Sequence, residues 1–218
     1  MVSIYAISNE FELSDAGRSS YLNSFPFDIQ KKILGFSKWQ DAQASFLGKV
    51  LLKKGLEDFK IDSNLSNLKY TSYGRPYIED ALDFNISHSG NWVVCAFSTI
   101  GRIGVDVEKI SPIPVCEFKS HFLEEEWNLI LRSENTYHTF YAYWTAKEAI
   151  IKAEGKGLSI PLYTIWIKGG LSVLGQTPWY YKSVSLADNY QMHIASDKPL
   201  IDIDLIKLSL DDIVNVKL

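Results

Sequence analysis

Cysteine is scarce in this chain, with only Cys95 and Cys116 among 218 residues. Two thiols do not make a disulfide framework for a chain of this length, so a reducing cytoplasm is the expected location. The first residues lack the basic start and long apolar run of a signal peptide. No apolar stretch approaches the length needed to cross a bilayer. These absences predict a soluble cytoplasmic protein without a membrane role.

An excess of positive charge is also lacking. The chain has 22 Lys and Arg against 26 Asp and Glu, a formal net charge of -4 and a pI near 5.6. This balance argues against a general binder of nucleic acid or membrane surfaces. The 46% of hydrophobic and 22% of charged residues are typical of a globular chain long enough to bury a core.

What the chain does contain is an order of elements that occurs twice. Apolar periodicity predicts a strand at 2–8, two helices within 27–59, and strands within 68–78, 82–90, 91–98 and 103–110. Helical patterns then cover 116–133 and 138–155, and strands are expected within 163–169, 179–187 and 190–197. Helices followed by strands, twice, predict an α+β fold with two similar halves.

The segment SPIPV, Ser111 to Val115, is the best candidate for a boundary between those halves because it carries two prolines just after a strand. The expected units are therefore residues 1–110 and 111–218. A site between two halves would collect side chains from both.

The stretch IGVDVEKI, Ile103 to Ile110, places two carboxylates on one strand face. Successive strand side chains alternate between faces, so Asp106 and Glu108 share the face opposite Val105 and Val107. Such a face can simply be wet. It can also hold a hard cation, since Mg²⁺ prefers one or two carboxylates and completes its shell with water and phosphate oxygens.

The long helical pattern carries a second charged group. Glu148 and Lys152 are four residues apart and so stack on one face, where the plain interpretation is a surface ion pair. Lys147 argues for more, because it projects from the middle of the apolar arc and must either snorkel or meet an anion. Glu148 would suit a third metal ligand from the helix.

Four further features are weak when taken singly. Glu126 lies in the acidic run LEEEWN, which can be only a solvated helix start. NISHS and GRPY can each be an ordinary turn, although Ser87, His88, Ser89 and Arg75 would suit a phosphate. Lys31, Lys32 and Lys38 can be a wet basic face.

The ordered set GRP, FNISHS, GVDVE and WTAKEAIIKAEGKGL, between about Lys32 and Leu158, resembles the 4′-phosphopantetheinyl transferases of the larger surfactin-synthetase type. The resemblance implies a pseudo-twofold α+β monomer in which each half packs helices on a small, mostly antiparallel sheet. It also implies transfer of 4′-phosphopantetheine from coenzyme A to a serine of an apo acyl or peptidyl carrier protein, with release of adenosine 3′,5′-bisphosphate. Carriers of fatty acid, polyketide and nonribosomal peptide synthesis all remain open as partners.

The resemblance also implies roles for individual residues. Mg²⁺, or Mn²⁺ in its place, would be held by Asp106, Glu108 and Glu148. The expected catalytic residues are Lys152 at the departing phosphate and either Glu148 or Glu126 as the general base. The residues expected to bind coenzyme A are Lys32, Ser45, Gly74, Arg75, Pro76, Ser87, His88, Lys147 and Lys152.

Two positions depart from the family pattern. A second lysine is common where this chain has Ile29, and an arginine commonly stands where it has Ala44. Both changes fall at the nucleotide end of the expected substrate, and Lys31 or Lys38 would have to compensate.

Two other classes of protein compete with the transferase. Another magnesium-dependent phosphate enzyme needs only the acidic residues and leaves GRP and the two lysines of the long helix unexplained. A non-catalytic carrier-protein or coenzyme A binding module predicts a missing metal ligand or a missing Lys152, and neither is missing.

Overall fold

The computed structural model describes residues 1–79 and 82–210, so the last eight residues of the expected second half, 211–218, lie outside it. The helices are α1 (Asp15–Leu22), α2 (Phe27–Leu34), α3 (Trp39–Asp58), α4 (Glu124–Arg132) and α5 (Thr136–Glu154). The strands are β1 (Val2–Ser8), β2 (Lys69–Tyr70), β3 (Pro76–Tyr77), β4 (Asp83–Ser89), β5 (Trp92–Ser98), β6 (Ile103–Lys109), β7 (Trp166–Lys168), β8 (Leu171–Leu174), β9 (Thr177–Ser183), β10 (Tyr190–Ser196) and β11 (Ile203–Leu208).

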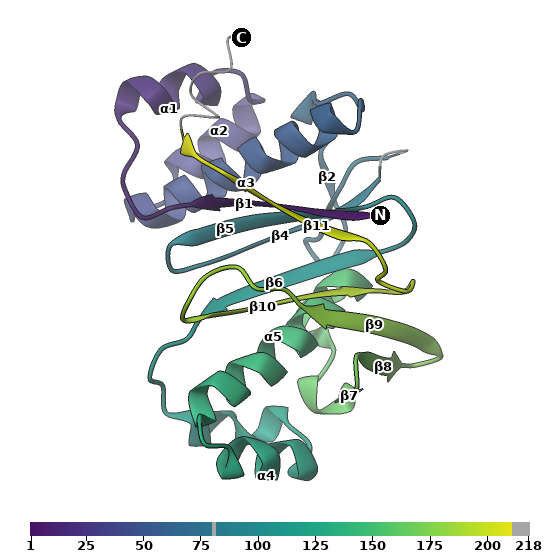
Figure 1. Cartoon of the computed structure of the whole chain (residues 1–218). Helices are drawn as coiled ribbons and strands as arrows, with labels where there is room; N and C mark the ends of the chain where they lie inside the picture. Colours follow the sequence, from purple (N-terminus) through teal and green to yellow (C-terminus); the bar gives the residue numbers. More distant parts are fainter. Residues whose placement is uncertain (80–81, 211–218) are drawn as a thin grey trace.

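The elements form four layers (Figure 1). Helix α3 packs on one sheet, with strand order β11-β1-β5-β4, and α2 packs against α3. Helix α5 packs on a second sheet, with order β6-β10-β9-β8-β7, and α4 packs against α5. Separate apolar clusters fill the space between α3 and the first sheet, between the two sheets, and between α5 and the second sheet. The fold is α+β, as predicted.

The two halves repeat one arrangement. The order β1-β5-β4 in the first sheet corresponds to β6-β10-β9 in the second, and every pairing in both sets is antiparallel. β11 then returns from the second half to pair in parallel with β1. The division at residue 110 stays a prediction, and the hydrogen bonds of β6 favour placing this strand with the second half.

The central strands are apolar because both of their faces are buried. On β5, Val93, Cys95 and Phe97 face the helices, whereas Val94 and Ala96 face the other sheet. Two buried faces demand a continuous apolar run rather than an alternating one. The run VVCAF satisfies that demand, and Cys95 is fully buried in the core.

Most predicted elements are confirmed, and three observed elements were not predicted. Helix α1 is short, and the strands β8 and β11 lie in segments where polar and apolar residues are mixed. Among the described residues, no helix combines the length and the apolar character needed to cross a membrane.

Candidate functional site

The acidic face of β6 lies beneath α5. Ile103, Val105 and Val107 pack between the sheets, so the opposite face turns toward the helix. Gly104 permits a close approach, because a Cβ there would lie 2.0 Å from the backbone oxygen of Ala149. The helix backbone therefore rests directly on this strand, and α5 brings Glu148 and Lys152 over the acidic face.

Asp106 is the centre of the polar group that results. Its side chain is 4% exposed, and its Oδ1 accepts hydrogen bonds from Lys152 Nζ at 2.6 Å and Ser87 Oγ at 3.1 Å. Oδ2 is buried and has no hydrogen-bond partner within the described residues. Burial raises the pKa of Asp106, while Lys152 and Ser87 act in the opposite direction. The wet-face interpretation of this carboxylate is therefore wrong.

Glu108 and Glu148 complete an acidic group. Glu108 accepts a hydrogen bond from Ser89 Oγ at 2.6 Å, and its pKa is raised by burial. Burial, followed by the negative charge of Asp106, raises the pKa of Glu148 to about 7. Neighbouring carboxylates disfavour each other's ionisation, so the three side chains form one electrostatically coupled group.

Strand β4 holds this group in place with its side chains. β4 and β6 belong to different sheets, yet every second side chain of β4 accepts a hydrogen bond from a backbone N–H of β6. The pairs are Asp83 with Ile103 (2.7 Å), Asn85 with Val105 (3.0 Å), Ser87 with Val107 (3.3 Å) and Ser89 with Lys109 (3.1 Å). The NISHS stretch thus joins the two sheets beside the acidic group. The polar residues at every second position from Asp83 to Ser89 were the signal for this role, and sequence reasoning missed it.

The donor set fits a hard cation in its chemistry. Carboxylate oxygens are the ligands that Mg²⁺ and Mn²⁺ prefer, and the unpartnered Asp106 Oδ2 is a buried oxygen that needs a positive partner. Within the described residues, however, no group of three or more His, Cys, Asp or Glu side chains is arranged to hold a metal ion. The assignment of Asp106, Glu108 and Glu148 as metal ligands stays a prediction.

The raised pKa of Glu148 predicts a specific pH dependence of stability. The folded state holds its proton up to pH about 7, above the ordinary value of 4.5. The contribution of Glu148 to the free energy of unfolding is therefore fully present below about pH 4.5. It is lost as the pH rises through 7, which lowers that free energy by about 1–3 kcal/mol for this partly exposed group. Urea unfolding between pH 4.5 and 8, with a chelator present, measures the fall. Glu148→Gln should remove it, and identical pH slopes for the two proteins would contradict the assignment.

The residues expected at the nucleotide end line a small cavity. Gly74, Arg75 and Pro76 surround about 180 Å³ together with Lys152. His88 lies on β4 with much of its side chain exposed, and its pKa is lowered by partial desolvation of the ring and by the charge of Lys152.

Two lysines of the first half, Lys32 and Lys49, lie close enough to repel each other. Lys32 lies over the ring of Tyr70, with Nζ 5.3 Å from its centroid. Lys49, one helical turn after the half-buried Ser45, has a pKa lowered by burial and by Lys32. Sequence reasoning missed Lys49, although its four-residue spacing from Ser45 was visible.

Glu126 and Lys147 form a separate pair. Lys147 Nζ donates to Glu126 Oε2 at 2.6 Å and to the Leu162 carbonyl at 3.1 Å, and both side chains are at most 3% exposed. Glu126 Oε2 also accepts the backbone N–H of Leu123 at the start of α4. The structure therefore places the predicted base Glu126 and the predicted ligand contact Lys147 against each other. It does not bring either residue into contact with Asp106.

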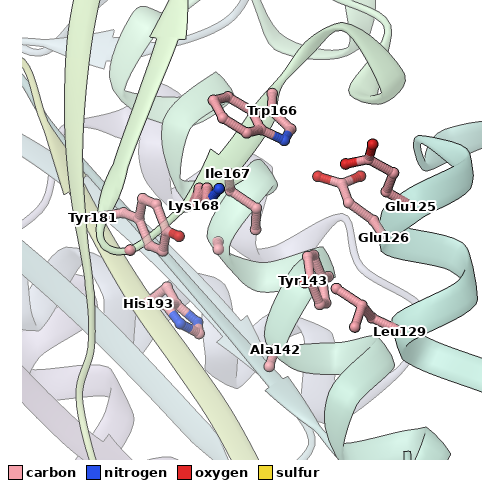
Figure 2. Close-up of a pocket in the computed structure, with 12 residues that line it drawn as sticks. Glu125, Glu126, Leu129, Ala142, Tyr143, Trp166, Ile167, Lys168, Tyr181 and His193 are labelled. Carbon is pink, nitrogen blue, oxygen red and sulfur yellow. The ribbon is translucent and has the colours of Figure 1, made fainter. Parts of the chain in front are cut away.

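Glu126 also lines a larger cavity, of about 430 Å³, between α4, α5 and the second sheet (Figure 2). Helix α5 contributes Ala142, Tyr143 and Ala146 to it. At about 100° per residue, these positions lie on the side of α5 away from Glu148 and Lys152. This cavity is thus separate from the carboxylate group.

A truncation separates a structural role of Glu126 from a catalytic one. Glu126→Ala leaves the buried ammonium of Lys147 without its charge partner, which should lower the free energy of unfolding by about 3–5 kcal/mol. Chemical denaturation measures this loss. The double variant Glu126→Leu with Lys147→Met should recover most of the stability, and its transfer activity then reports whether Glu126 is needed as a base. A single variant as stable as the parent protein would contradict the structural role.

The chain is an α+β protein in which two halves share one acidic site. Two similar α+β halves meet at a buried group of carboxylates with a lysine, and a cavity beside it is lined by Arg75 of the first half and by the end of α5.

Comparison with known proteins identifies the family. Residues 102–193 match the family model described as the 4′-phosphopantetheinyl transferase superfamily, and residues 14–100 match that of the 4′-phosphopantetheinyl transferase N-terminal region. The chain is 31% identical over 222 residues to the 4′-phosphopantetheinyl transferase Sfp of Bacillus subtilis, covering 96% of this chain and 99% of that protein. It is 36% identical over 141 residues to the 4′-phosphopantetheinyl transferase gsp of Aneurinibacillus migulanus, covering 63% and 59%. The chain belongs to the 4′-phosphopantetheinyl transferases of the Sfp type, as the sequence motifs predicted.

Proposed function

We propose that this transferase takes 4′-phosphopantetheine from coenzyme A and attaches it to a serine hydroxyl of an apo acyl or peptidyl carrier protein. The reaction would depend on Mg²⁺, which Mn²⁺ could replace, and would release adenosine 3′,5′-bisphosphate. The observation that carries the proposal is the contact of Lys152 Nζ with Asp106, at 2.6 Å, beside the unpartnered Asp106 Oδ2. A cation and a carboxylate oxygen lacking a partner together suit a metal-bound pyrophosphate.

The roles of the residues follow from their places. Asp106, Glu108 and Glu148 would hold the metal, which when bound offsets the negative charge that builds up on the phosphate oxygens. Lys152 is 28% exposed, so its ammonium is free to turn from Asp106 to the α-phosphate. The cavity at Gly74, Arg75 and Pro76 would receive the nucleotide end, with Lys32 and Lys49 at the 3′-phosphate.

The transfer step then balances. The serine oxygen of the carrier bonds to the β-phosphorus, the bond from that phosphorus to the bridging oxygen breaks, and the α-phosphate leaves as the 5′-phosphate of adenosine 3′,5′-bisphosphate. The serine proton needs a base. Glu148, which lies beside Asp106, is better placed for this role than Glu126, whose carboxylate is engaged with Lys147.

We further propose that a single chain is sufficient, because β4 of the first half and α5 of the second meet at the same acidic group. Among the relatives, one is named the L-aminoadipate-semialdehyde dehydrogenase-phosphopantetheinyl transferase of Xenopus laevis, with 31% identity over 155 residues. That name gives a dehydrogenase as the protein with which that relative is associated.

Mass spectrometry of apo carrier proteins incubated with enzyme, coenzyme A and Mg²⁺ tests the proposal. A mass gain of one phosphopantetheine on the carrier serine is expected, with adenosine 3′,5′-bisphosphate appearing only when carrier is present. Release of the bisphosphate without carrier would support a phosphate hydrolase instead. Binding of coenzyme A without any product would support a binding module.

A further inference from the structure

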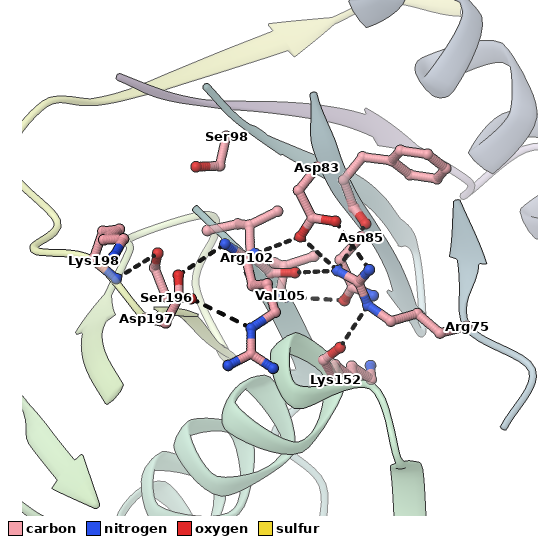
Figure 3. A network of polar contacts seen from close by, with 12 residues as sticks. Arg75, Asp83, Asn85, Ser98, Arg102, Val105, Lys152, Ser196, Asp197 and Lys198 are labelled. Carbon is pink, nitrogen blue, oxygen red and sulfur yellow. Dashed lines mark hydrogen bonds and ion pairs between the residues drawn. The ribbon is translucent and has the colours of Figure 1, made fainter. Parts of the chain in front are cut away.

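Arg75 is the most heavily engaged side chain near the site. Its Nε donates to the backbone carbonyl of Lys152 at 3.0 Å, and its two outer nitrogens donate to Asp83 at 2.9 and 2.6 Å (Figure 3). The outer nitrogen Nη2 also reaches the carbonyl of Ile103 at 3.0 Å and that of Phe84 at 3.4 Å. A planar guanidinium with these five hydrogen bonds has its charge balanced and its fork filled.

Asp83 extends the same connection to a third element. Its Oδ2 accepts the backbone N–H of Ile103, the first residue of β6, at 2.7 Å as well as the bond from Arg75. Arg75 and Asp83 are 12% and 24% exposed in their side chains. This partly buried pair therefore joins β4, the start of β6 and the end of α5.

The end of α5 is shaped to receive this arginine. The carbonyl of Lys152 lies in the last turn, where helix carbonyls lack partners within the helix, and a positive charge there is favourable. Gly155 ends the helix at a φ of 90°, and a Cβ at this position would lie 2.9 Å from Arg75 Cδ. Gly155 is thus required twice, because the helix end needs a left-handed backbone and because the Arg75 side chain passes too close for a Cβ.

Lys152 is consequently held at two points. Its side chain contacts Asp106 and Ser87, and its backbone is held by Arg75. We propose that Arg75 is a positioning residue, which places Lys152 for transfer through the backbone of α5 rather than by binding a phosphate of the substrate. The catalytic part of this inference rests on the proposed function, and it replaces the phosphate contact that the sequence resemblance implies for Arg75.

Removal of Asp83 separates the two roles. If Arg75 bound phosphate, Asp83→Ala would free its guanidinium, and binding of coenzyme A would stay the same or tighten. If Arg75 positions Lys152, then Arg75→Ala, Asp83→Ala and the double variant should each lower kcat at least tenfold to a similar extent. Each should change the Kd for coenzyme A less than threefold, and by the same factor for 3′-dephospho-coenzyme A.

Two further variants sharpen the comparison. Arg75→Lys keeps the charge but loses the fork, so we expect it to lower kcat like Arg75→Ala, whereas a phosphate contact would be largely retained. Arg102→Ala is the matched control, because Arg102 also pairs with an aspartate, Asp197 at 3.3 Å, but makes no contact with Lys152 (Figure 3). Its kcat should be unchanged.

Amide hydrogen exchange tests the inference without any transfer assay. Loss of Arg75 or Asp83 should raise exchange in the last turn of α5, around Lys152 to Gly155, and Arg102→Ala should not. Unchanged exchange in that turn would overturn the inference even if transfer were fully established. The inference would also be overturned if Arg75→Ala lost its affinity for coenzyme A and the double variant with Asp83→Ala regained it. Absence of transfer by the parent protein would count against the proposed function, and the exchange result would still decide whether Arg75 holds α5.

Discussion

Asp106→Ala is expected to lower magnesium-dependent transfer by about 10³-fold. Metal coordination contributes several kcal/mol to a phosphoryl transfer, and each 1.36 kcal/mol is a factor of ten in rate. Asp106 is central because its buried Oδ2 has no other partner within the described residues and its Oδ1 contacts Lys152. The rate of carrier modification at saturating coenzyme A and Mg²⁺ is the measurement.

The fold should survive this substitution. Lys152 is 28% exposed, so its ammonium can be solvated once its partner is gone. Thermal unfolding checks this point, and the stabilisation of the parent protein by Mg²⁺ should be absent from the variant. Asp204→Ala, which removes an exposed carboxylate on β11, is the matched control. Full activity in Asp106→Ala would show that the metal assignment is wrong.

Lys152→Ala is expected to lower turnover by about 10²-fold or more, with a much smaller change in affinity for coenzyme A. The negative charge on the departing α-phosphate grows as its bond to the β-phosphorus breaks, so a cation there stabilises the transition state more than the bound substrate. A loss confined to kcat is the signature of such a contact.

Steady-state kinetics and calorimetric binding of coenzyme A separate these two quantities. Lys168→Ala removes an exposed lysine beside the cavity on the other side of α5 and should change neither. A Lys152→Ala variant that binds coenzyme A far more weakly but turns over normally would assign Lys152 to substrate binding alone.

Local sequence patterns predicted the helices and strands whose formation depends only on residues close together in the chain. The periodicity of 138–155 predicted α5, and alternation in IGVDVEKI placed Asp106 and Glu108 on one face. Which environment that face meets was open, because a wet face and a covered one have the same alternation. Gly104 decides it, since the missing Cβ lets α5 lie on the strand.

Contacts between segments that are distant in the sequence could not be predicted from such local patterns. β11 pairs with β1 across the whole length of the chain, and a mixed sequence such as DLIKL does not identify its partner. Arg75 looked like a phosphate ligand because an arginine fork matches phosphate and carboxylate equally well. Only the fold shows that Asp83 and the carbonyl of Lys152 meet it.

The sequence by itself determined the family, the two-half α+β fold and two pairs that share a face, Asp106 with Glu108 on β6 and Glu148 with Lys152 on α5. These pairs follow from the strand and helix periods, which are local properties of the chain. The tertiary structure decided which of the polar residues are free to react. Glu126 and Lys147 neutralise each other, and Arg75 is held by Asp83. An ion pair depends on where two remote backbones bring their side chains, and that is a property of the packed fold alone.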